Sequence, residues 1–516
     1  MGNKKTIDNL SRGQKAIIST ITSLGLEVVN VIAALIIPRM ILGFYGSEVN
    51  GLMSSITQFL GYATLLQMGV GGVIRAELYK PLAEKDHVKI SKVMKATAQF
   101  FTKIAVVCCL YIIILSLIYP SVVKQSFDFF YTFFLILIIG ASTAAQYFWG
   151  FPYRALVMAD QKVFIYDFLQ IISVLLNIII TVILILAGCS IHIVKLGSSI
   201  VFCIQPIVLK KYCERYYRLD SSAEPDNNAI KQRWNGAGYS LADFVHRNTD
   251  VFVITVFSSL KLVSVYSIYS TIYNGVNSII TMCTNSFGAA IGDMIAKKET
   301  DVLNNTFKLY EFITHVVASI VYAVAMVMII PFIRIYTEGI TDVNYVENTF
   351  AIVILTAELM FCLRQPYQTV VTSAGHFRQT QKGAYIEAVM NIVISIFLVS
   401  KYGLIGVAIG TLVSMIYRTL DLMAYVKKYL LSIAWTRVIK RYLISFVSIV
   451  IPVLILNNIS IVIDSFISWF FWAIIWGVLI SIEVIFLNWI LYRKEFFMLK
   501  NKIIGILLKN KHIRNR

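Results

Sequence analysis

The sequence predicts an all-α polytopic membrane protein, and three observations support this fold class. Hydrophobic residues make up 58% of the 516 residues and charged residues only 14%, whereas soluble domains contain about 45–50% apolar and ~25% charged residues. The mean hydropathy is +0.74. Apolar stretches of about 20 residues, the length that spans a bilayer, recur along the whole chain. These observations exclude a soluble enzyme, a disordered protein and a fibrous protein.

The apolar stretches predict about fourteen transmembrane helices by the length criterion. The first stretch follows a basic segment but is too long for the apolar core of a signal peptide, so we interpret it as an uncleaved membrane helix. The candidate spans are 16–38, 48–71, 97–119, 128–150, 164–187, 191–209, 236–258, 265–290, 309–333, 347–372, 383–400, 403–425, 442–458 and 467–491.

The distribution of positive charge sets the predicted orientation. The net charge is +18, and we attribute it to cytoplasmic loops, which collect Lys and Arg, rather than to nucleic-acid binding. With the N-terminus inside, most Lys and Arg fall in inside segments and both termini are cytoplasmic. The outside segments hold only Arg39, Lys124, Lys195, Lys261, Arg334 and Lys401. Arg75 and Arg154 fall at cytoplasmic helix ends, where we interpret them as positive-inside residues, with contact to an anionic headgroup as the alternative.

A polar linker divides the helices and predicts two lobes. The predicted sections are an N-lobe of six helices at 1–212, a cytoplasmic linker at 213–235, a C-lobe of six helices at 236–429, and two further helices with a basic cytoplasmic tail at 430–516.

The two lobes show a weak internal repeat, which is typical of secondary transporters. Polar residues and prolines are rare in spans, so an ordered series of them carries more weight than matching isoleucines. The recurring positions are Pro120 and Pro331, Pro152-Tyr153 and Pro366-Tyr367, Asn177 and Asn391, Gly197 and Gly410, and Lys210-Lys211-Tyr212 and Lys427-Lys428-Tyr429. Because each lobe has an even number of helices, the two are predicted to be related by an axis along the membrane normal.

The span 236–258 carries the densest group of ionisable residues, namely Asp243, His246, Arg247 and Asp250. Their spacing places them on one face of a helix. We predict a polar stripe toward a cavity, in which Arg247 attracts an anion such as phosphate and the two acids position it or carry a coupling cation or proton. The alternative is a self-satisfied ion-pair cluster, with Arg247 between the two acids.

Four further ionisable residues in spans are candidate cavity residues. Glu27 is a carboxylate in the first span, and a polar helix contact is its alternative role. Glu358 and Arg364 precede Pro366, which is expected to kink the helix, and Arg364 is a candidate second cationic site. Arg418 is expected to pair with Asp421 at i,i+3 near the cytoplasmic end of its helix.

Motifs for other chemistries are missing from the sequence. No P-loop, H-E-x-x-H motif or metal-ligand cluster occurs, so neither ATP hydrolysis nor metal catalysis is predicted. The seven cysteines are interpreted as buried apolar residues. The predicted outside loops are short, which disfavours a membrane enzyme such as an oligosaccharide polymerase. We therefore predict a protein that is not an enzyme and needs no cofactor beyond a coupling H+ or Na+.

Three segments of the sequence carry a family resemblance. They are Ile36–Leu52 with Tyr45-Gly46 and Asn50-Gly51-Leu52, Leu66–Gly71 followed by Arg75, and Arg247-Asn248-Thr249-Asp250 with Val263–Ser267. With these segments the sequence resembles the bacterial polysaccharide flippases of the multidrug/oligosaccharidyl-lipid/polysaccharide (MOP) exporter superfamily. It covers most of the chain. It implies two six-helix lobes as in the MATE transporters, a V-shaped cavity, alternating access and two C-terminal helices.

By this resemblance the protein moves a polyprenyl-pyrophosphate-linked oligosaccharide from the inner to the outer leaflet of a bacterial cytoplasmic membrane. The lipid-linked oligosaccharide and membrane lipids are then its partners, and a monomer suffices because one chain forms the cavity. The alternative is an H+- or Na+-coupled multidrug exporter. Flippases for the peptidoglycan precursor carry basic residues in their first helices, whereas this chain has the acid Glu27, which argues against that substrate.

Overall fold

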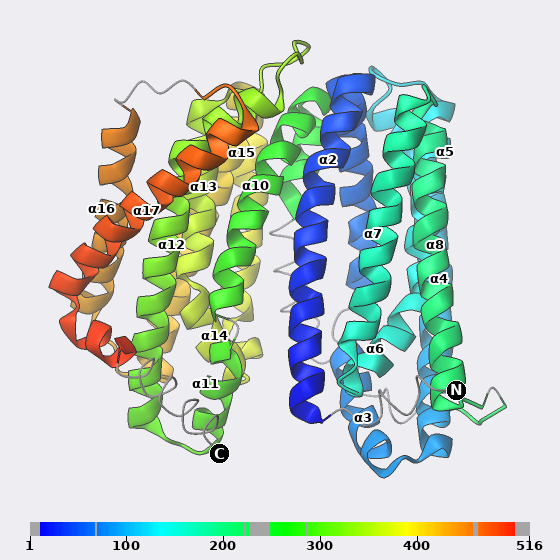
Figure 1. Ribbon diagram of the computed structural model, residues 1–516, viewed down its shortest axis with the longest axis horizontal. Coiled ribbons are helices and arrows are strands. Elements are labelled where there is room, and N and C mark those ends of the chain that lie inside the picture. The colour runs from blue at the N-terminus through cyan, green and yellow to red at the C-terminus, as the bar shows by residue number, and fades with distance from the viewer. Residues whose placement is uncertain are drawn as a thin grey trace. The chain divides into compact units, whose positions relative to one another are not determined.

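The computed structural model describes residues 11–67, 70–220, 222–226, 248–284, 286–457 and 463–500. Within these ranges the regular elements are helices (Figure 1). Ten of the described helices are long and apolar enough to cross a membrane, or eleven if one bent pair counts as a single span. The predicted all-α polytopic membrane fold is therefore confirmed.

Part of the difference between ten helices and about fourteen predicted spans has a local cause. Helix α2 (Arg12–Gly61) covers the first two predicted spans, and α15 (Phe377–Tyr429) covers two more. Each helix is interrupted at one glycine, Gly46 with φ 82° and Gly403 with φ 53°. Positive φ favours glycine because an L side chain would be strained there. Two connections that the sequence predicts as loops are therefore kinks within longer helices.

The described chain divides into two compact units. The first unit comprises Met1–Phe244 with Ser259–Ser264, and the second comprises Val245–Ser258 with Val265–Arg516. The last two helices therefore belong to the second unit.

The first unit is built on α2, which packs along α7, and on further pairings of α4 with α5, α7 with α8, and α3 with α6. Asp86 and Asp128 cap two of these helices, since their side chains accept hydrogen bonds from backbone N–H groups at the starts of α4 and α5. The elements after α2 are η1 (Tyr62–Gln67), α3 (Val70–Glu84), α4 (His87–Val122), α5 (Phe129–Ala145), η2 (Gln146–Gly150), α6 (Phe151–Ala159), α7 (Val163–Leu186) and α8 (Ile191–Tyr217).

Within the first unit, α2 approaches the start of α10 closely. A Cβ on Gly51 would overlap the backbone carbonyl of Leu260. The side-chain amide of Asn50 donates to Ser264 Oγ at 2.8 Å, and both residues are buried. A small residue thus lets two helix backbones meet, as small residues commonly do in membrane proteins. Asn50 and Gly51 belong to the motif that carries the family resemblance.

The second unit repeats the element order of the first and adds two helices. The elements are a helix at Asn248–Phe257, α10 (Leu260–Thr284), α11 (Ser286–Ala296), α12 (Thr300–Tyr336), α13 (Asn348–Leu363), α14 (Gln365–Ser373), α15, α16 (Trp435–Asn457) and α17 (Phe466–Leu491). Helix α12 packs against α13, α16 and α17. The chain breaks between α13 and α14 at the predicted position, next to Pro366.

The repeat is visible at matching positions of the two units. Short helices α6 and α14 each carry a proline in their first turn, Pro152 and Pro366. Gly197 lets α8 pack against α7 near Ile180, and Gly410 lets the two halves of α15 pack together near Ser395. The duplicated helices therefore keep the same close contacts.

Candidate functional site

The densest predicted group is described only at its last member. Asp243, His246 and Arg247 lie outside the described residues. Asp250 lies in the helix Asn248–Phe257 and is 4% exposed. Its environment is therefore the part of this prediction that the structure describes.

Asp250 is surrounded by hydroxyl and amide groups. Its Oδ2 accepts hydrogen bonds from Tyr266 OH and from Thr411 Oγ1, each at 2.9 Å. Asn391 Nδ2 donates to the same threonine hydroxyl at 3.1 Å. Tyr273 OH lies 2.9 Å from Tyr266 OH, which extends the network away from the carboxylate. We call Asp250, Tyr266, Asn391 and Thr411 the carboxylate cluster.

Two oxygens of the carboxylate cluster are buried without a hydrogen-bond donor in the described part of the chain. They are Oδ1 of Asp250 and Oδ1 of Asn391. No described Lys, Arg or His pairs with Asp250. A buried carboxylate is costly unless a cationic side chain, a proton or a bound cation neutralises it. Carboxylate, amide and hydroxyl oxygens are the ligands that hard cations prefer.

A second polar group joins two of the predicted arginines to acids. Arg364, which is 2% exposed, donates to Glu387 Oε1 at 2.5 Å. Arg418 Nε lies 3.5 Å from Glu387 Oε2. Arg418 Nη1 also contacts Asp421 Oδ2 at 2.7 Å, which is the predicted i,i+3 pair. The glycine at 383 leaves room for this contact, because a Cβ there would overlap Asp421 and Arg418.

This four-residue ionic cluster balances two arginines with two acids. Arg364 and Arg418 are therefore buried and paired with acids, and their role in substrate binding stays a prediction. Glu387 had no predicted role, yet it bridges both arginines. The sequence offered one signal, an acid inside an apolar span, where a lone charge is costly and requires a partner.

The other two predicted acids lie in different places. Glu358 accepts a hydrogen bond from the side-chain amide of Asn277 at 2.8 Å. Tyr322 OH donates to Oδ1 of the same asparagine at 2.5 Å. Glu27 on α2 is half-buried. Nearby on α2, Ser23 donates to buried Asp167 of α7. Asp167 is an acid that was not among the predicted site residues.

A second ionic cluster joins α16 to α12. Arg437 Nη2 lies 3.1 Å from Glu311 Oε2, and Glu311 is fully buried. Tyr367 of α14 donates to the other oxygen of that carboxylate. Arg441, which is 1% exposed, lies over the Tyr492 ring at 3.7 Å and 3.8 Å from Glu495 Oε1. These contacts join α16 to α12 and to the segment that follows α17.

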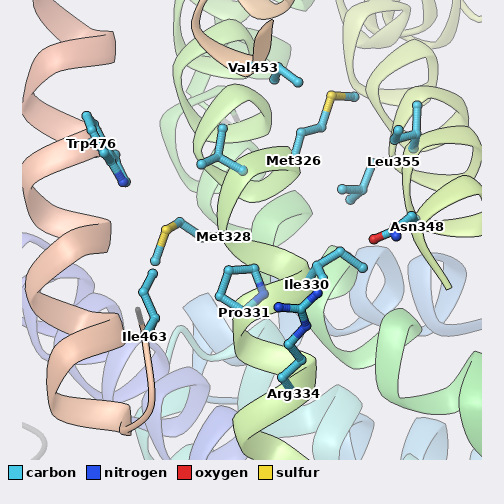
Figure 2. A pocket seen from close by; sticks show the side chains of 13 residues that line it. Met326, Met328, Ile330, Pro331, Arg334, Asn348, Leu355, Val453, Ile463 and Trp476 are labelled. Atoms are coloured by element: carbon cyan, nitrogen blue, oxygen red, sulfur yellow. The ribbon is translucent and has the colours of Figure 1, made fainter. Parts of the chain in front are cut away.

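The second unit also contains a cavity of about 410 Å³ that α12, α13, α16 and α17 line (Figure 2). Most of the residues that line it are apolar, with Met326, Met328 and Trp476 among them. Arg334 and Asn348 supply polar groups to the lining (Figure 2). None of the predicted site residues that the structure describes lines this cavity.

Neither comparison of the sequence with known proteins gives a match. No protein-family model matches the chain, and no curated protein matches it. Comparison of the structure with solved structures is informative.

The solved structures that are similar to this chain share one fold, the transporter fold of the MOP superfamily. An inward-facing MATE-family multidrug resistance transporter of that superfamily has a TM-score of 0.60 and 12% identity, over 79% of this chain and 98% of its own. The MATE multidrug transporter DinF-BH has a TM-score of 0.60 and 15% identity, over 81% of this chain and 97% of its own.

The inward closed conformation of the lipid II flippase MurJ is also similar, with a TM-score of 0.70 and 17% identity. That match covers 92% of this chain and 99% of the flippase. The chain therefore has the fold of flippases and transporters of this superfamily, and it is a multi-pass membrane protein.

Proposed function

We propose that the protein is a flippase that moves a polyprenyl-pyrophosphate-linked oligosaccharide from the inner to the outer leaflet of a bacterial cytoplasmic membrane by alternating access, for surface polysaccharide synthesis. It works as a monomer with both termini in the cytoplasm. A sugar head is too polar to cross the hydrocarbon core alone, so its passage needs a protein.

One observation carries this proposal, namely the extent of the structural matches. The lipid II flippase aligns with 92% of this chain, whereas the two multidrug transporters align with 79% and 81%. The chain thus shares a longer architecture with a protein that moves a lipid-linked substrate. The ionic contacts of Arg437 and Arg441, which join α16 to α12 and to the segment after α17, support the extra helices as an integral part of the second unit.

The carboxylate cluster supplies the proposed coupling to an ion gradient. Asp250 and Asn391 each present a buried oxygen without a donor in the described part of the chain. A sodium ion or a proton bound there would neutralise the carboxylate, and its release would restore a buried charge that favours a different conformation. Arg247 is proposed, from the sequence alone, to attract the pyrophosphate, with Asp243 and His246 beside it.

The first test is in cells. Deletion of the gene is expected to reduce surface polysaccharide and to raise the lipid-linked oligosaccharide pool on the inner leaflet. The wild-type gene restores both, whereas Asp250→Asn and Arg247→Ala do not. Unchanged polysaccharide in the deletion strain contradicts the proposal.

The multidrug exporter is the alternative function, and the two MATE matches favour it. In that case acids such as Asp250 and Glu358 bind a cationic drug. The same deletion strain distinguishes the two functions, because an exporter predicts new sensitivity to cationic drugs and normal surface polysaccharide.

A further inference from the structure

A small pocket in the first unit is lined by two arginines. It lies among η1, α3, α4 and α6 and has a volume of about 200 Å³. Arg75 of α3 and Arg154 of α6 face it, together with Gln67 and the rings of Phe101 and Phe151. We call it the arginine pocket.

Each arginine is held by a neighbour through a contact that does not use its outer nitrogens, Nη1 and Nη2. Arg75 uses Nε to donate to the backbone carbonyl of Gly71 at 3.2 Å. The guanidinium of Arg154 lies over the Tyr166 ring, with its central carbon 4.5 Å from the ring centre. Both side chains are half-buried. Fixed guanidinium groups lose little entropy when they bind a ligand.

Neither arginine has an acidic partner among the described residues. Two lysines of the same unit do have such partners. Lys162 lies 2.7 Å from Asp160, and Lys210 lies 3.8 Å from Glu214. Two half-buried cations that line one pocket repel each other, and an anion placed between them relieves this repulsion. The pocket therefore has the charge of an anion site.

We propose that the arginine pocket binds the phosphate of a membrane lipid, and that the diphosphate of the flippase substrate is its ligand. The assignment to the substrate rests on the proposed function. A guanidinium matches phosphate oxygens with two parallel hydrogen bonds. The volume is below the roughly 300–1,000 Å³ typical of drug-sized ligands, so the pocket takes a phosphate headgroup and leaves the sugar and the lipid tail outside.

The position of the pocket in the chain fits this ligand. Arg75 and Arg154 follow the predicted spans 48–71 and 128–150, whose ends the charge distribution predicts to be cytoplasmic. Phosphates of inner-leaflet lipids lie at that depth, next to the hydrocarbon core. The rings of Phe101 and Phe151 stack with their centres 6.0 Å apart and give the pocket an apolar wall.

Binding to the full-length protein in phosphatidylcholine nanodiscs tests the proposal. Three probes are titrated: a short-chain prenyl diphosphate, phosphatidylglycerol and inorganic pyrophosphate. Arg75→Gln and Arg154→Gln are each expected to weaken binding of the prenyl diphosphate at least tenfold. Lys103→Gln, which removes an exposed cation of α4, is the matched control and should bind as the wild type does. The proposed site is contradicted if Lys103→Gln loses affinity for the prenyl diphosphate, or if the two arginine variants keep it.

The probes distinguish the sources of phosphate. Preference for the prenyl diphosphate over phosphatidylglycerol supports the substrate assignment, whereas equal affinity overturns it and assigns the pocket to bulk lipid. If inorganic pyrophosphate is the only probe that binds tightly, the proposal that the ligand is a lipid phosphate is overturned. Thermal melting of each variant confirms folding before titration.

Failure of this site and failure of the proposed function give different results. If the double variant Arg75→Gln with Arg154→Gln restores surface polysaccharide to the deletion strain, the flippase stands and the arginine pocket is wrong. If the deletion leaves polysaccharide unchanged while arginine-dependent binding of prenyl diphosphate persists, the site stands and the proposed function is wrong.

Discussion

The two units carry equivalent helices but different charges at equivalent positions. In the first unit, Arg154 follows the repeated Pro-Tyr pair of α6 and lines the arginine pocket. In the second unit, Gln368 occupies the position after the same pair in α14. One unit therefore presents a cation where the other presents a neutral amide.

The opposite difference occurs at the repeated asparagines. In the first unit, Asn177 accepts from Thr181, whose hydroxyl also lies 3.3 Å from Ser198 Oγ, and the group is neutral. In the second unit, Asn391 and Thr411 join the buried carboxylate of Asp250. The two units therefore share their backbone packing but differ in the charges that equivalent positions carry. An anion site is proposed in the first unit and a cation site in the second.

Substitutions of the carboxylate cluster are expected to have the largest effect. Asp250→Asn removes the charge that a coupling cation neutralises, so a sodium or proton gradient should no longer accelerate transport in proteoliposomes. The expected loss of gradient-driven rate is at least tenfold, which is about 1.4 kcal/mol or more. Asn391→Ala should lower the rate as well.

The equivalent asparagine of the first unit is the control for this prediction. Asn177→Ala leaves every member of the carboxylate cluster in place, so gradient-driven transport should persist. Equal loss in Asn177→Ala and Asn391→Ala would show that the two units do not differ in this respect.

The repeated glycines are expected to differ in stability rather than in transport. A Cβ at Gly410 would overlap Ser395 Oγ and lie 2.9 Å from the Ser395 backbone nitrogen. A Cβ at Gly197 would lie 2.9 Å from a methyl group of Ile180 and 3.0 Å from one of Leu184, so it would meet side-chain atoms rather than backbone. Overpacking a core costs about 1–3 kcal/mol, so Gly410→Ala should fall at the upper end and Gly197→Ala at the lower end. Thermal melting in detergent measures both, and a larger loss at Gly197 contradicts the packing argument.

Part of this architecture follows from the sequence for clear physical reasons. Apolar length predicts the spans, and Pro366 predicts the break between α13 and α14 because proline removes a helix hydrogen bond. Gly46 and Gly403 are harder to interpret, since a glycine between spans is equally compatible with a loop or with a kink at positive φ.

The partners of buried polar groups are not predictable in the same way. Tyr266 and Thr411 reach Asp250 from helices far apart in the chain. Helical periodicity shows which face a residue occupies but not which helix packs against that face. The pairing of Arg364 with Glu387 illustrates this limit, because the sequence presents each as a lone charge.

The repeated tyrosines provide a last comparison of the two units. Tyr367 donates to Glu311, whose side chain is fully buried, whereas Tyr153 OH lies 3.1 Å from Glu214, whose side chain is 44% exposed. A hydrogen bond to a charged group contributes about 1.5–3 kcal/mol, and its loss costs most where water cannot replace the donor. Tyr367→Phe should therefore lower the melting temperature clearly, and Tyr153→Phe should lower it by less. Equal shifts in melting temperature would mean that water reaches Glu311 as readily as Glu214. The argument that a buried Glu311 holds α16 through Arg437 would then be contradicted.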